Sequence, residues 1–111
     1  MKFVVSLIFA ATASLSLTAQ ANDEGTAAIE TLGKLNGIAL ACQQPALVSR
    51  ARNAVTTTAP KTRSNGEIFE NATNASYLEQ GKGRPCPELP QLVEQISQAE
   101  KRLQAAFPAA K

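Results

Sequence analysis

Two cysteines constrain the fold of this 111-residue chain more than any other feature. Cys42 and Cys86 lie 44 positions apart, and the chain has no other cysteine. A chain of this length buries only a modest core, so an added constraint helps to hold it. Two cysteines allow a single intramolecular disulfide, and closing a loop of this length would stabilise the fold by about 4 kcal/mol. Free thiols and pairing with another chain are the alternatives, and the cellular compartment decides among them.

The first 21 residues predict that compartment. Lys2 follows the initiator methionine, an almost unbroken apolar run covers 3–11, and Ala19-Gln20-Ala21 ends the segment. This order is typical of a cleaved secretory signal peptide, and the run is too short for a membrane span, which needs about 20 apolar residues. We therefore expect a bacterial precursor with a signal peptide at 1–21 and one domain at 22–111, located in the periplasm or secreted. An oxidising compartment favours a Cys42–Cys86 disulfide.

Helical periodicity runs through the rest of the chain. Apolar residues recur every three or four positions in four stretches, and no stretch shows the alternation of a strand. We predict an all-α domain, a small four-helix bundle with one disulfide, in which short connections join antiparallel neighbours. The predicted helices span 26–42, 45–58, 64–80 and 88–107, with both aromatic residues of the third helix in the core.

Small residues form a second line along the first predicted helix. Gly33, Gly37 and Ala41 follow one another at four-residue steps, so they share one face. Each glycine costs about 1 kcal/mol of helix propensity relative to alanine, and close packing of another helix is the compensation we expect. That helix belongs to this domain, in the interpretation we favour, or to a partner.

The third predicted helix has a start signal and charged flanks. Ser64 or Asn65 is its expected N-cap, and Glu67 completes a capping-box pattern with Ser64. Charged residues at its two ends and on its surface are candidates for binding an anion or a partner protein, with ordinary solvated charge as the alternative. These candidate partner-binding residues are Lys61, Arg63, Lys82, Arg84 and Glu70.

Composition argues against several function classes. The chain has no His, which removes the commonest general base and the commonest metal ligand. The cysteines lack the close spacing of a redox centre or a zinc site. The net charge of +2 falls to +1 without Lys2, and the positive residues are dispersed rather than gathered for nucleic acid. We expect no enzymatic activity, no cofactor, no metal, and no membrane association after signal cleavage.

In size and layout the exported part resembles the acid-stress periplasmic chaperones and, equally loosely, small periplasmic immunity proteins. The resemblance covers the helical plan and one disulfide between distant cysteines. Leu40-Ala41-Cys42-Gln43-Gln44 lacks the acidic and aromatic residues that the chaperones carry near their first cysteine, so no functional residue is transferred. We expect a non-enzymatic protein that binds another exported or envelope protein, as an inhibitor or immunity factor, accessory subunit or chaperone. A small-ligand or metal carrier with a pocket between helices is the alternative. A homodimer is a further alternative.

Overall fold

The computed structural model describes residues 17–108, with side chains from residue 23 onward. Within this range the chain forms four α-helices and no strand: α1 (Leu17–Ala41), α2 (Pro45–Thr58), α3 (Arg63–Gln80) and α4 (Leu89–Ala106). The all-helical prediction is confirmed, and α2 has the predicted limits. α1 begins at Leu17 rather than at residue 26. Most of the predicted signal peptide lies outside the described residues, so its cleavage stays a prediction.

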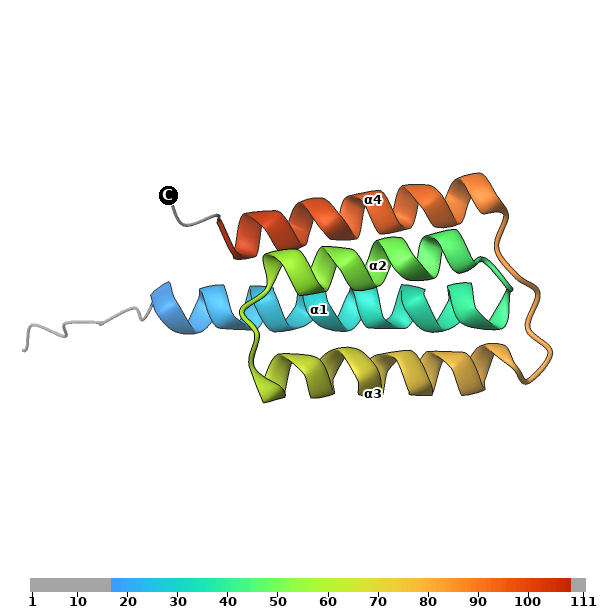
Figure 1. Ribbon diagram of the computed structural model, residues 1–111, viewed down its shortest axis with the longest axis horizontal. Helices are drawn as coiled ribbons and strands as arrows, with labels where there is room; N and C mark the ends of the chain where they lie inside the picture. The colour runs from blue at the N-terminus through green and yellow to red at the C-terminus, as the bar shows by residue number, and fades with distance from the viewer. Residues whose placement is uncertain (1–16, 109–111) are drawn as a thin grey trace, which may run out of the picture.

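α1 is the centre of the bundle, and the helices alternate in direction along the chain (Figure 1). It packs against α2, α3 and α4, and α2 also packs against α4, whereas the backbone of α3 approaches α1 alone. α1 and α3 run parallel, since Gly33 faces Phe69 and Ala72, and Gly37 faces Thr73 and Tyr77 further along both helices. The expectation that every helix packs against its sequence neighbours is therefore wrong for α3.

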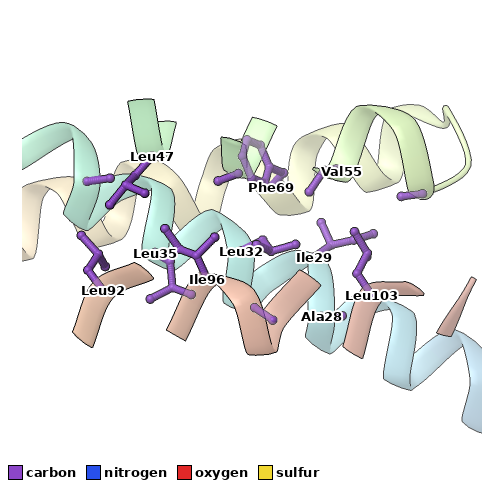
Figure 2. Close-up of a cluster of buried hydrophobic side chains, with 14 residues drawn as sticks. Ala28, Ile29, Leu32, Leu35, Leu47, Val55, Phe69, Leu92, Ile96 and Leu103 are labelled. Atoms are coloured by element: carbon purple, nitrogen blue, oxygen red, sulfur yellow. The ribbon is translucent and has the colours of Figure 1, made fainter. Parts of the chain in front are cut away.

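The apolar core lies where α1 faces its three neighbours. In Figure 2, Leu35 points toward Ile96, and Ile29 points toward Leu103. Full burial of one such side chain stabilises the fold by about 1.5–3 kcal/mol. The buried apolar residues are Ala28, Ile29, Leu32, Leu35, Ala39, Leu47, Ala51, Val55, Ala59, Phe69, Leu92, Ile96, Ala99 and Leu103.

The third helix contributes less to this core than its sequence pattern predicts. Phe69 is buried, but Tyr77 is 48% exposed because, within residues 17–108, the only helix backbone that approaches α3 is that of α1. The prediction that both aromatic residues build the core is therefore wrong for Tyr77. Phe69 has a further neighbour in α2, because the guanidinium of Arg52 lies 5.5 Å from the centre of its ring.

The predicted disulfide is confirmed. Cys42 and Cys86, with Cα atoms 5.9 Å apart, join the end of α1 to the connection between α3 and α4. Gln43 next to the bridge takes a left-handed φ of 59°, which ends α1 and lets the Gln44 amide donate to the Ala39 carbonyl at 2.9 Å. Pro45 then starts α2, where a missing N–H leaves no helical hydrogen bond unmade.

The cap of α3 differs from the prediction. The Thr62 hydroxyl accepts a hydrogen bond from the Asn65 amide at 3.1 Å, so Thr62 and not Ser64 or Asn65 is the N-cap. Thr62 has the extended backbone of a cap residue, with φ −112° and ψ 154°. The Asn65 side chain instead donates to the Pro60 carbonyl at 2.9 Å and fixes the preceding turn.

An ion pair fastens α2 to α4. Both Nε and Nη2 of Arg50 donate to the Glu100 carboxylate, the shortest of these hydrogen bonds being 2.6 Å. The hydrogen bond to Glu100 is also the main reason why the pKa of Arg50 is raised. Within the described residues, no ion pair or side-chain hydrogen bond joins α3 to α4.

Candidate functional site

α3 and α4 leave one side of α1 uncovered. Both helices pack on α1, but their backbones do not approach each other. A stripe of α1 therefore lies open between them, with Glu30 and Lys34 exposed and Ile38 partly buried. We call this surface the open face. It comprises Glu30, Thr31, Lys34 and Ile38 of α1, Ala72, Ala75 and Glu79 of α3, and Gln95, Gln98 and Arg102 of α4.

Two hollows flank the α1 stripe on this face. The hollow between α1 and α3 has a volume of about 370 Å³, and the hollow between α1 and α4 has a volume of about 320 Å³. Lys34 and Ile38 line both hollows and form the ridge between them. Small and apolar side chains of α3 thus line one hollow, and the central ridge carries charged Lys34 beside Ile38.

The glycine line explains why α3 lies so close to α1. A Cβ atom on Gly33 would lie 2.6 Å from the Phe69 carbonyl oxygen, and a Cβ atom on Gly37 would lie against the Thr73 carbonyl oxygen. Neither position has room for a side chain, so the crossing needs glycine at both. Ala41, the third small residue, is the last residue of α1 and is partly exposed. The helix that packs closely on the two glycines belongs to this domain.

A buried polar pair lies at the same crossing, and the sequence analysis missed it. Asn36 is 0% exposed, and its Nδ2 donates to the Thr73 hydroxyl at 3.1 Å. Its Oδ1 has no hydrogen-bond partner among the described residues. The Thr73 hydroxyl in turn lies 2.8 Å from the Phe69 carbonyl oxygen and 3.1 Å from that of Gly33. The pattern contained a signal, because Asn36 follows Leu32 by four positions and so falls on the apolar face.

The predicted charged residues do not gather into one patch. Lys82 and Arg84 both pair with Glu79, at 3.3 Å and 2.7 Å. Hydrogen bonding from Lys82, and then the charges of Lys82 and Arg84, hold the pKa of Glu79 below its ordinary value. Arg84 also lines the hollow between α1 and α3, so this end of α3 borders the open face.

The other three candidate partner-binding residues lie outside the open face. Arg63 is the first residue of α3 and pairs with Glu67 at 3.0 Å, and exposed Lys61 is in the turn before the helix. Glu70 accepts a hydrogen bond from Arg52 at 2.8 Å on the side of α3 that faces α2. The structure therefore brings Lys82 and Arg84 together but separates them from the other three candidates.

The described part of the chain offers no metal cluster, since residues 17–108 hold no group of three His, Cys, Asp or Glu placed to share an ion. Nor is any helix within this range long and apolar enough to cross a membrane. No family model, curated protein or solved structure matches the chain.

Proposed function

We propose that this chain is an exported, non-enzymatic protein that acts by binding another protein through the open face. The observation that carries the proposal is that α3 and α4 both pack on α1 but not on each other. The disulfide supports export, because such bridges persist in oxidising compartments. The absence of His from the sequence supports a role without acid–base catalysis.

The open face has the layout of a protein interface. Ile38, Ala72 and Ala75 line the hollow between α1 and α3. The central ridge carries Lys34 beside Ile38, and α4 adds the charged side chain of Arg102. Interfaces generally combine an apolar centre with a polar rim. A helix of about 10 Å diameter fits over the α1 stripe and fills both hollows. An α-helix of the partner is therefore the segment we expect on this face.

Site-specific photo-cross-linking in living cells tests this proposal. A photoreactive residue replaces Ala75 in one hollow or Gln98 in the other, and Asn74 serves as the matched control because it is an exposed neighbour on α3 that lines neither hollow. We expect positions 75 and 98 to capture the same protein and position 74 to capture none. Equal capture from all three positions, or no capture from 75 and 98, would contradict the proposal.

A small-ligand carrier is the second candidate, favoured by one observation. The hollow between α1 and α3 has a volume of about 370 Å³ and apolar walls at Ile38, Ala72 and Ala75, within the 300–1,000 Å³ common for ligand sites. Native mass spectrometry of the purified chain distinguishes the candidates. A bound mass that Ala75→Trp removes would favour the carrier, and an unliganded mass would count against it.

A further inference from the structure

We propose that a second copy of this chain occupies the open face, with its α1 lying antiparallel on the α1 of the first copy. This inference rests on the proposed protein-binding function and names the partner. Three properties of the face carry it: its charge pattern, the register of α3 on α1, and its size.

The charge pattern of α1 is complementary to itself. Glu30 and Lys34 are both exposed and lie one helical turn apart, and none of the ion pairs among the described side chains involves either of them. A two-fold axis level with residue 32 places Glu30 opposite Lys34 of the second copy, and Lys34 opposite Glu30. Two equivalent ion pairs form at the centre, as expected for an isologous contact.

The register of α3 is compatible with the same two-fold rotation. Gly33 of α1 is level with Phe69 and Ala72 of α3, so the axis passes near residue 70 of α3. The two-fold rotation places partly buried Ile68 of one copy opposite Ala72 of the other, so that a large side chain meets a small one. Ile68 shares the helix face of Ala72, four positions earlier. α4 adds the uncharged side chains of Gln95 and Gln98 and one charged side chain, that of Arg102.

The size of the face is sufficient for a dissociable dimer. About 17 residues of α1 at about 1.5 Å each give a length of about 25 Å, and three helices side by side at about 9 Å spacing give a width of about 25 Å. The footprint is then about 600 Å² per copy, or about 1,200 Å² in total, at the lower end of stable interfaces. We therefore expect a dimer that dissociates on dilution.

Sedimentation equilibrium of the chain purified from the periplasm tests the inference, with charge reversals as the perturbation. Lys34→Glu places two glutamates opposite each other at both central contacts, and Glu30→Lys places two lysines there. Each single reversal should weaken dimerisation by at least about 10-fold. The double variant Glu30→Lys/Lys34→Glu restores opposite charges and should recover the affinity of the original chain. Lys101→Glu is the control, because it changes the net charge as Lys34→Glu does on an exposed position outside both hollows.

Each outcome decides the inference. A dimer that responds to both single reversals, recovers in the double variant and ignores Lys101→Glu supports it. A chain that stays monomeric at millimolar concentration overturns it, and so does a dimer that is indifferent to the reversals. Circular dichroism shows whether each variant is folded. If position 75 still captures a different protein in cells while the purified chain is monomeric, the inference fails and the proposed function stands.

Discussion

Replacing Gly37 by alanine tests the crossing of α1 and α3, the contact that sets the width of the open face. The added methyl group would meet the Thr73 carbonyl oxygen and would lie 2.8 Å from both the Ser76 Cβ and the Tyr77 amide nitrogen. Two of these three atoms belong to the α3 backbone, which cannot rotate away as a side chain can. α3 must therefore retreat as a unit.

The size of the effect follows from those distances. Ordinary contact begins at 3.4 Å, so the two 2.8 Å contacts alone require α3 to move by about 0.6 Å, and the closer Thr73 carbonyl oxygen requires a larger shift. Such a shift would stretch the 3.1 Å hydrogen bond from Asn36 to Thr73 and the 2.6 Å hydrogen bond from Ser76 to the Lys34 carbonyl. Overpacking lowers the free energy of unfolding by about 1–3 kcal/mol, and each weakened hydrogen bond lowers it by up to about 1 kcal/mol. The higher helix propensity of alanine raises it by about 1 kcal/mol. The central expectation is a loss of about 2 kcal/mol.

Urea denaturation followed by circular dichroism measures this loss, and the chain supplies its own control. Gly66 is exposed in α3, and a Cβ atom added there meets nothing within 4 Å. Gly66→Ala should therefore stabilise the protein by about 0.5–1 kcal/mol, opposite in sign to Gly37→Ala. If both substitutions stabilise the protein by similar amounts, the close approach of α3 to α1 is refuted.

Three further predictions concern the other constraints on α3. Replacing Cys42 and Cys86 by serine should lower the free energy of unfolding by about 4 kcal/mol in urea titrations, and an unchanged midpoint would contradict a stabilising bridge. Thr73→Val removes the hydroxyl that accepts a hydrogen bond from buried Asn36 Nδ2, and it should cost about 1–3 kcal/mol in thermal melts. Adding Asn36→Leu to this variant removes the unpaired side-chain amide and should recover part of the loss. A further loss in the double variant would argue against the unpaired amide as the cause. The pKa of Glu79 is lower in the folded chain than its ordinary value of 4.5, so near that pH the unfolded chain binds more protons than the folded chain. The stability that ionised Glu79 contributes is therefore lost as the pH falls through its folded pKa. Glu79→Gln should then flatten the acid side of the stability–pH curve, and an unaltered slope in urea titrations at several pH values would contradict the role of Lys82 and Arg84.

The sequence predicts the buried faces of α1, α2 and α4 well because their apolar residues repeat at helical spacing and face one shared core, although α1 begins earlier than predicted. Ile29, Leu32, Ile96 and Leu103 are all buried as their spacing indicates. Leu89 is an exception, 49% exposed, because it is the first residue of α4.

The position of α3 was harder to predict, because periodicity identifies an apolar face but not the helix that covers it. Short connections favour contact between sequence neighbours, yet the glycines of α1 allow α3 to approach this helix more closely than larger side chains would. Gly33 and Gly37 carried that signal, but their pattern does not name the helix that fits them. The open face follows from the same choice, so it was not predictable from residue types alone.

The position of the disulfide also determines how the bundle would respond to mechanical force. The start of α1 and the end of α4 lie at the same end of the molecule, where Phe107 covers Gly25, while the bridge lies at the opposite end (Figure 1). Tension between the two chain ends would peel α4 from α1 turn by turn until it reached Cys42–Cys86, where a covalent bond would carry the load. The polypeptide between the two cysteines, including α2 and α3, would then bear no tension along its length and could not be extended while the bridge is intact.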